Sequence, residues 1–411
     1  MTTLISFVIQ NARWLSAGVL LTFMSSFGQT FFISLFAAEI RTGFGLSHGE
    51  WGALYAMGTT AAAVAMIWGG GLTDRFRARA LGTLVLVGLA SACVALAGSR
   101  SVILLPVIVF FLRFFGQGMS RHLSMVAMAR WFTRSRGRAL SIANLGYSFG
   151  EITLPICIVL LMGFIDWRLI WLGSAVVALM GVPLLRGLLK QERSPRDAVD
   201  QTDSSGMFGK HWTRPECLKH WLFWAMAPTI LGISAFVTTF LFHQVYFAEL
   251  KGITHLALVS TFPFFTGVSI AATLAAGWSL DKWGTARLMP IMCLPIALGF
   301  VFFATAAGLP GILVGLFFMG LTAGSSATVI PAFWAEYYGT RHIGAIKAAA
   351  AALLVLGSAA GPGLTGALID QGVSLDLQYY GVGIYFLISS ALIGLAVTKA
   401  NLNLKSSPVT P

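Results

Sequence analysis

The sequence has few charged residues, and this shortage excludes most classes of soluble protein. Of its 411 residues, 10% are Asp, Glu, Lys or Arg and 57% are hydrophobic, and the mean hydropathy is +0.81. A soluble domain is typically about one quarter charged. Because the chain lacks the polar side chains to cover two or three soluble domains, we expect a membrane protein.

Motifs for metal, nucleotide and catalytic sites are also missing. The four cysteines (Cys93, Cys157, Cys217 and Cys293) lie far apart without a CxxC pair, which argues against a disulfide framework or a zinc site. Neither the phosphate-binding pattern GxxxxGK[ST] nor HExxH occurs, and the histidines do not cluster. The basic residues are dispersed between apolar runs, which argues against a nucleic-acid partner. We expect no enzyme activity, no cofactor and no metal.

Twelve apolar runs are long enough to cross a bilayer, which takes about 20 helical residues. We number them spans 1 to 12: Leu15–Ala38, Trp51–Gly71, Ala80–Gly98, Val102–Ala129, Ala139–Phe164, Leu169–Leu185, Trp221–Leu250, Leu256–Ser279, Leu288–Gly308, Ile312–Tyr338, Ala348–Ile369 and Gly381–Thr398. The predicted fold class is an all-α membrane protein with twelve transmembrane helices.

One polar segment divides the chain near its middle. Arg186–Lys219 has 12 charged residues in 34, so we predict a bundle over residues 1–189, a cytoplasmic linker over 190–218 and a second bundle over 219–411. With the N-terminus inside, cytoplasmic segments hold 21 Lys and Arg residues and outer loops hold four. This bias follows the positive-inside rule and places both termini in the cytoplasm. Compact loops and the absence of an N-x-S/T sequon suggest a bacterial inner membrane.

Similar motifs recur in the two halves at nearly constant offsets. G-x-x-x-D-[RK] follows span 2 and again span 8, with the aspartates 207 residues apart. G-x-x-x-G occurs in spans 5 and 11 at an offset of 211 residues, and a Trp near the ends of spans 4 and 10 repeats after 203. The residues involved are Gly70, Asp74, Arg75, Gly146, Gly150 and Trp131 in the first half and Gly277, Asp281, Lys282, Gly357, Gly361, Pro362 and Trp334 in the second. The repeats predict two pseudo-symmetric six-helix bundles.

With these motifs, nearly the whole chain resembles the major facilitator superfamily of secondary transporters. Span 4 also carries RFFGQG (starting at Arg113), which is similar to the Arg/Gly motif of that family. The sequence departs from the family pattern at Arg77, where the first loop motif usually has a second glycine (the second copy keeps it as Gly284), and at Glu151, where the span 5 motif usually has proline. The resemblance implies two bundles that rock about a binding site at mid-membrane.

The repeated loops suggest a cytoplasmic gate. Gly70 would allow close helix approach, and Asp74 would face the positive end of a neighbouring helix. The alternative is that these charges only establish topology. The candidate gate residues are Gly70, Asp74, Arg75, Arg136 and Arg138 in the first half and Gly277, Asp281, Lys282, Glu336 and Arg341 in the second. We expect Gly146, Gly150, Gly357, Gly361 and Pro362 to serve helix packing.

Charged residues within spans are functional candidates, because burying a charge in the bilayer is costly. Arg113 and Glu151 lie near mid-depth on consecutive antiparallel spans and are expected to pair, either as a structural lock or in substrate and proton coupling. Arg113, Gln117 and Arg121 recur at every fourth position, which places them on one helical face. Asn144 and Tyr147 share the face of Glu151.

Two further polar side chains complete the candidate binding site. Gln29 in span 1 is bulky and difficult to satisfy by packing, and His243 near the outer end of span 7 is a candidate ligand or proton carrier.

The charges within the membrane favour one substrate class. Arg113, Arg121 and Glu151 sum to +1, which favours transport of a small organic anion by a monomeric secondary transporter, coupled to protons or a counter-solute. The alternative is a proton-coupled exporter of hydrophobic drugs or metabolites. Both need the lipid bilayer and a small-molecule substrate.

Overall fold

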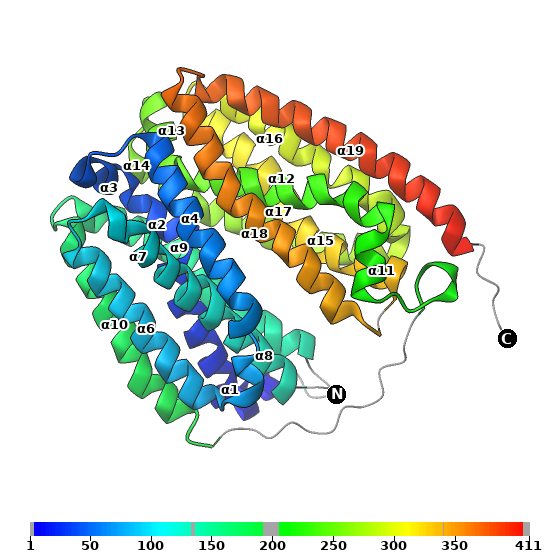
Figure 1. The fold of residues 1–411 in the computed structure, drawn as a ribbon, viewed down its shortest axis with the longest axis horizontal. Helices are drawn as coiled ribbons and strands as arrows, with labels where there is room; N and C mark the ends of the chain where they lie inside the picture. The colour runs from blue at the N-terminus through cyan, green and yellow to red at the C-terminus, as the bar shows by residue number, and fades with distance from the viewer. Residues whose placement is uncertain (1–3, 133–135, 192–204, 340, 406–411) are drawn as a thin grey trace. The chain divides into compact units, whose positions relative to one another are not determined.

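The computed structural model describes residues 4–132, 136–191, 205–339 and 341–405. They form two compact units: unit 1 comprises residues 1–201 with Leu241–Val245, and unit 2 comprises 202–240 with the remainder. In unit 1 the α-helices are α1 (Leu4–Met24), α2 (Thr30–Ile33), α3 (Ala37–Phe44), α4 (His48–Gly69), α5 (Leu72–Arg75), α6 (Ala78–Gly98), α7 (Leu105–Phe111), α8 (Arg121–Trp131), α9 (Arg136–Met162) and α10 (Trp167–Leu188) (Figure 1). 3₁₀ turns η1 (Ser25–Gly28), η2 (Ser34–Phe36) and η3 (Val102–Leu104) and the π-helix η4 (Leu112–Ser120) join them.

Helices also make up most of the described residues of unit 2. Its helices are α11 (Arg214–Lys219), α12 (Trp221–Phe242), α13 (Gln244–Leu250), α14 (His255–Val259), α15 (Phe262–Ile291), α16 (Cys293–Thr305), α17 (Leu309–Tyr338), α18 (Ile343–Asp370) and α19 (Leu375–Lys405), preceded by the 3₁₀ turn η6 (Met207–Gly209).

The predicted spans are confirmed as helices. Ten helices of the described residues are long and apolar enough to cross a bilayer, and a bent pair (Ser6–Gly28 with Thr30–Phe44) raises the number to eleven. The 22-residue α4 lies where span 2 is predicted, and a capping box between Ser47 and Glu50 begins it. Every predicted span therefore corresponds to a helix or a bent helix pair.

The same kind of close glycine contact occurs inside each of the two units. A Cβ atom added at Gly146 would lie 2.1 Å from the Val19 carbonyl oxygen, and one at Gly357 would lie 2.3 Å from that of Leu231. Gly150 and Gly361, one helical turn further, likewise meet the hydroxyls of Ser26 and Thr239. Spans 5 and 11 thus pack against spans 1 and 7 through the same small-residue motif.

Span 1 is broken rather than continuous. Its two halves meet at an angle of 46°, and Gln29 between them is extended, with φ −84° and ψ 153°. At the break, Gly28 lies against Gly116 of span 4 so closely that a Cβ added at Gly116 would be 2.6 Å from the Gly28 Cα. This backbone crossing needs glycine on both helices.

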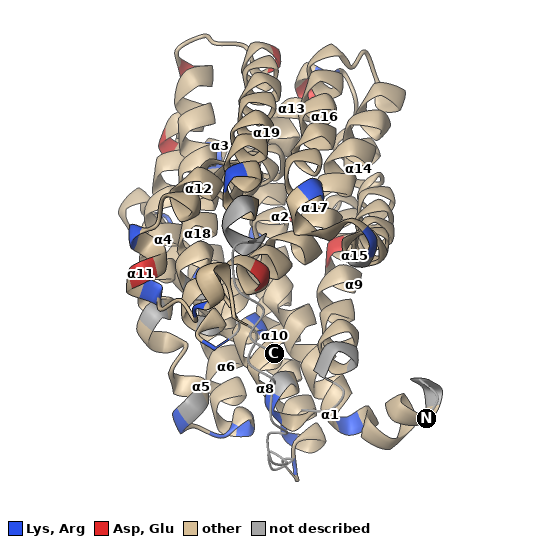
Figure 2. Cartoon of the chain, turned by 90° about the vertical axis from the view of Figure 1, so that its right-hand side faces the viewer, with Lys and Arg blue, Asp and Glu red and all other residues tan. Residues whose placement is uncertain are grey.

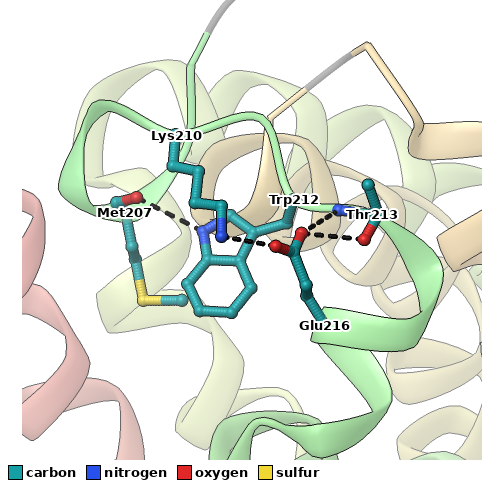
Figure 3. A network of polar contacts seen from close by, with 5 residues as sticks. All are labelled: Met207, Lys210, Trp212, Thr213 and Glu216. Atoms are coloured by element: carbon teal, nitrogen blue, oxygen red, sulfur yellow. Dashed lines mark hydrogen bonds and ion pairs between the residues drawn. The ribbon is translucent and has the colours of Figure 1, made fainter.

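The end of the linker is folded within unit 2. Trp212 donates its backbone N–H to the Tyr338 carbonyl of α17, and its indole N–H to the Met207 carbonyl. Thr213 and Glu216 form a capping box that begins α11, and Glu216 also pairs with Lys210 (Figure 3). The Lys210 and Thr213 hydrogen bonds hold the pKa of the Glu216 carboxyl at about 2. This part of the predicted linker is therefore an ordered cover over the end of α17.

The cysteines do not form disulfides. All four are free thiols, and Cys157 on α9 is exposed whereas Cys93, Cys217 and Cys293 are buried. In unit 1, Lys and Arg gather at the end that carries α5 and the end of α8 (Figure 2). This is the end predicted to be cytoplasmic.

Candidate functional site

Span 4 is not a regular α-helix around its two arginines. Leu112–Ser120 is a π-helix, whose wider turns change the direction of the side chains that follow. Arg113 contacts spans 1 and 2, whereas Arg121, the first residue after the π-helix, contacts span 5. The two arginines lie about two turns apart and have different neighbours, and their common face stays a prediction.

Arg113 is buried at the break in span 1. Its guanidinium donates to the Gly28 carbonyl at 3.2 Å and to the Thr30 hydroxyl at 3.1 Å. The same Thr30 hydroxyl lies 2.7 Å from the Tyr55 hydroxyl, and the guanidinium lies 5.5 Å from the centre of the Tyr55 ring. Arg113 therefore supplies a donor to a carbonyl that the broken helix leaves without its helical partner.

Arg121 lies in a separate polar cluster with three residues of span 5. Its guanidinium lies 4.6 Å from the centre of the Tyr147 ring and donates to the Asn144 amide oxygen at 3.4 Å. The Tyr147 hydroxyl donates to the Glu151 carboxylate at 2.9 Å. Four of the predicted site residues are thus brought together, since Asn144, Tyr147 and Glu151 recur at helical spacing on α9.

The Arg121 charge has no acidic partner among the described residues. Its hydrogen bond goes to a neutral amide, and its other contact is with an aromatic ring. Arg113 and Glu151, which were expected to pair, each have a different partner, Gly28 with Thr30 for the arginine and Tyr147 for the acid. Of the two arginines within span 4, Arg121 is therefore the candidate for contact with a ligand.

The remaining predicted site residues are located as follows. Gln29 is 5% exposed at the break in span 1, and its Nε2 has no partner among the described residues. Gln117 is half-buried on the π-helix. His243 is buried in the Leu241–Val245 segment of unit 1, with its ring 6.0 Å from that of His48.

One short pattern in this region resembles a catalytic motif without having its geometry. Gly146–Gly150 reads G-x-S-x-G, the pattern of the nucleophile elbow in hydrolases. That elbow is a sharp turn between a strand and a helix, whereas these residues lie inside the continuous helix α9. Ser148 is therefore an ordinary helical residue.

In the first half, a residue that was not among the predicted gate residues contacts the loop motif. Arg130 at the end of span 4 donates to the Thr73 carbonyl of the loop motif at 2.7 Å. Gly70 allows the approach of α8, since an added Cβ would lie 3.3 Å from the His122 ring nitrogen. Arg75 is exposed. The side chains of Asp74, Arg136 and Arg138 lie outside the described residues.

In the second half, the loop motif also contacts the end of span 10. The Thr285 hydroxyl donates to the Glu336 carboxylate at 2.5 Å. Gly284, the second glycine of the motif, has φ +71°, a conformation that breaks the helix and favours glycine. Lys282 lies over the Trp278 and Trp283 rings, which form a separate exposed cluster.

The other second-half residues do not join this contact. Arg341 is exposed, and Gly277 faces open space, with nothing described within 4 Å of an added Cβ. The Asp281 side chain lies outside the described residues. The loop-to-span contact is therefore repeated in both units, although the bonding groups differ.

Comparison with known proteins identifies the class. The Major Facilitator Superfamily profile matches residues 18–362, so the chain belongs to that family. No curated protein matches it significantly. Among solved structures, it is similar to a bacterial homolog of the human lysosomal transporter Spinster (15% identity, 98% of this chain and 99% of that chain, TM-score 0.70) and to the nucleoside transporter NupG (13% identity, 94% and 99%, TM-score 0.68).

These findings establish the general activity. The chain is a multi-pass membrane protein with the twelve-helix, two-bundle architecture of the family, and it is a transporter of small molecules rather than an enzyme. Because the identities to the solved structures are low, these matches support the fold alone. The family profile confirms the resemblance predicted from the motifs.

Proposed function

We propose that the protein is a secondary active transporter that moves a small organic anion across the membrane by alternating access. The observation that carries this proposal is the position of Arg121, a cation inside a span whose described contacts include no acid. A charge within the bilayer is costly unless it is compensated. A carboxylate from the substrate would provide that compensation, with a geometry that guanidinium matches in a bidentate manner.

The surrounding residues support an anion site. Tyr147 covers one side of the Arg121 guanidinium and donates its hydroxyl to Glu151. The Asn144 amide oxygen, on the same face of α9 as Tyr147, accepts a hydrogen bond from the guanidinium. Glu151 is the group we assign to proton or counter-solute coupling, and we assign both termini to the cytoplasmic side of a bacterial inner membrane and the active state to a monomer.

The first experiment is a thermal-stability screen of the purified protein in a neutral detergent. A ligand present at 100 times its Kd stabilises the folded state by about 2.7 kcal/mol. We expect organic anions to raise the unfolding temperature of the wild type, Arg121→Met to abolish the shift, and Arg121→Lys to retain part of it. Stabilisation by cations or neutral solutes, with none by anions, would contradict the proposal.

A second candidate function is proton-coupled export of hydrophobic drugs or metabolites. It is favoured by Glu151, an acid within span 5 that accepts a hydrogen bond from the neutral Tyr147 hydroxyl. Exchange of the best ligand from the screen across proteoliposomes separates the two. In an anion transporter Arg121→Met stops exchange, whereas in a drug exporter Arg121→Met leaves exchange intact and Glu151→Gln removes the dependence of export on a pH gradient.

A further inference from the structure

A row of aromatic rings lies where the linker enters span 7, and a lysine lies over the ring at each end. The Trp212 ring is 4.8 Å from the His220 ring, which is 5.6 Å from the Trp221 ring. The Lys210 ammonium lies 5.4 Å from the centre of the Trp212 ring (Figure 3), and the Lys399 ammonium lies 5.2 Å from that of Trp221. All five residues belong to unit 2.

The two lysines differ in their acidic partners. Lys210 forms an ion pair with Glu216 of α11. Lys399 is exposed, and its contact among the described residues is with the Trp221 ring rather than with an acid. The two helices that meet here, α12 over Trp221–Phe242 and α19 over Leu377–Lys405, contain no Asp or Glu in these ranges. The Lys399 charge can therefore be balanced by an anion from outside the protein.

The lysine and its ring lie at the depth of lipid head groups. Trp221 is the first residue of the candidate span Trp221–Phe242, and Lys399 lies two residues before the end of Leu375–Asn401. Their contact places the start of one span beside the end of the other. Tryptophan and lysine are both favoured at such span ends, where one part of the side chain is apolar and the other part meets polar groups.

Exposed indole rings accompany this cation. Trp221 is 38% exposed and Trp224, one turn further along α12, is 56% exposed. The Trp224 indole N–H donates to the Leu218 carbonyl at 2.8 Å, so the polar edge of this ring is held by the linker. The surface thus combines a cation with apolar rings, which is the chemistry of a lipid at the junction of its head group and acyl chains.

We propose that Trp221, Trp224 and Lys399 bind the head group of an anionic phospholipid. The lysine ammonium pairs with the phosphate as a point charge, and the two indole rings contact the glycerol and the first acyl carbons. Phosphatidylcholine carries a cation beside its phosphate, so its attraction to Lys399 is weaker. The proposal concerns unit 2 alone and is independent of the transported substrate.

Native mass spectrometry of the delipidated protein in neutral detergent tests the site, with phosphatidylglycerol and phosphatidylcholine of the same acyl chains as probes. We expect the first phosphatidylglycerol to bind about fivefold more tightly than phosphatidylcholine, the contribution of one basic residue to an anionic lipid. Lys399→Gln should remove this preference. The matched control Lys190→Gln, which replaces an exposed lysine just after α10 in unit 1, should retain it. Equal binding of both lipids by the wild type, or equal effects of the two substitutions, overturns the proposal.

Substitutions of the ring test the aromatic part of the site. Trp221→Leu removes the ring beneath Lys399 and should weaken phosphatidylglycerol binding, whereas Trp221→Phe keeps an aromatic ring and should retain most of it. Equal binding by these two variants contradicts a role for the ring.

Amide hydrogen exchange locates the lipid and identifies its source. We expect phosphatidylglycerol to increase protection of the Leu218–Trp224 segment and of the end of α19 around Lys399, and soluble glycerol 3-phosphate to give no protection there. Protection confined to other segments overturns the site. Equal protection by glycerol 3-phosphate overturns the assignment to a lipid, because the indole rings would then contribute nothing.

Discussion

Two arginines eight positions apart on span 4 have different environments, and we expect them to have different roles. Arg113 is enclosed and bonded to a backbone carbonyl and a hydroxyl, whereas Arg121 is half-buried over an aromatic ring. We expect Arg113 to stabilise the bundle, and we propose that Arg121 is available to a ligand. The intervening π-helix separates the two environments.

The structural role of Arg113 can be tested by replacing Arg113 itself and by replacing Tyr55, whose hydroxyl bonds the Thr30 partner of the arginine. Arg113→Met leaves the Gly28 carbonyl without this donor, and we expect a loss of about 1–3 kcal/mol in the free energy of unfolding. Tyr55→Phe removes the hydroxyl that bonds Thr30 and should cost about 1 kcal/mol. Both are measured by unfolding in mixed detergent micelles.

Glu151→Gln serves as the control for direct pairing. Because the Glu151 carboxylate bonds Tyr147 rather than Arg113, we expect Glu151→Gln to change stability by less than about 1 kcal/mol and to add independently to Arg113→Met. Two results together would support a direct pair instead: Glu151→Gln alone greatly lowers stability, and the double variant is as stable as Arg113→Met alone.

Some of these residues could be predicted from sequence and others could not. Asn144, Tyr147 and Glu151 were found because polar residues at helical spacing stand out in an apolar span. Arg130 and Thr30 were missed, because their partners are backbone carbonyls or a hydroxyl on another helix. Every residue has a carbonyl, so such a contact has no signature in the sequence.

At the scale of single elements, span 1 departs most from expectation. Its composition predicts a continuous helix, because Gly28 and Gln29 are tolerated in helices and no proline occurs there. The break depends on tertiary contacts, namely the Gly28–Gly116 crossing and the bond from Arg113. Such contacts override local propensity.

Gly28→Ala tests the crossing. Its Cβ would lie 2.1 Å from the Leu112 carbonyl oxygen, so the helices must separate, and we expect a loss of at least about 1–3 kcal/mol in unfolding free energy. Gly173→Ala is the matched control, because nothing lies within 4 Å of that position on α10 and the change should stabilise by about 0.5–1 kcal/mol. Equal stability of the two variants would contradict a tight crossing.

The ordered end of the linker should respond to acid. The Glu216 pKa is lowered to about 2 from an ordinary value near 4.5, so its contribution to folding is complete above pH 4.5 and is lost as the pH falls toward 2. We expect amide exchange in the Gly206–Lys219 segment, corrected for intrinsic rates, to increase over that range. Glu216→Gln keeps an acceptor for Thr213 but loses the charge, and it should show the increase at neutral pH. Equal protection of the wild type at pH 5 and pH 2.5 would contradict this assignment.

At the scale of the whole molecule, the two halves have the same helix-packing contacts but different hydrogen-bonding groups. Spans 5 and 11 use the same glycine contacts against spans 1 and 7. The loop motifs also contact the ends of spans 4 and 10, but through Arg130 and the Thr73 carbonyl in one unit and through Glu336 and the Thr285 hydroxyl in the other. Packing motifs could be predicted because they recur in the sequence, whereas the bonding groups differ between the halves.

The four thiols have a practical consequence for following motion during transport. Cys157 lies on the exposed surface of a membrane span and the other three cysteines are buried, so the native chain offers one lipid-facing thiol for a membrane-permeant spin label. It lies six residues after Glu151 on α9, about 9 Å along the helix axis. Span 5 therefore carries a natural attachment point for spectroscopy beside the polar cluster, without an engineered cysteine-free background.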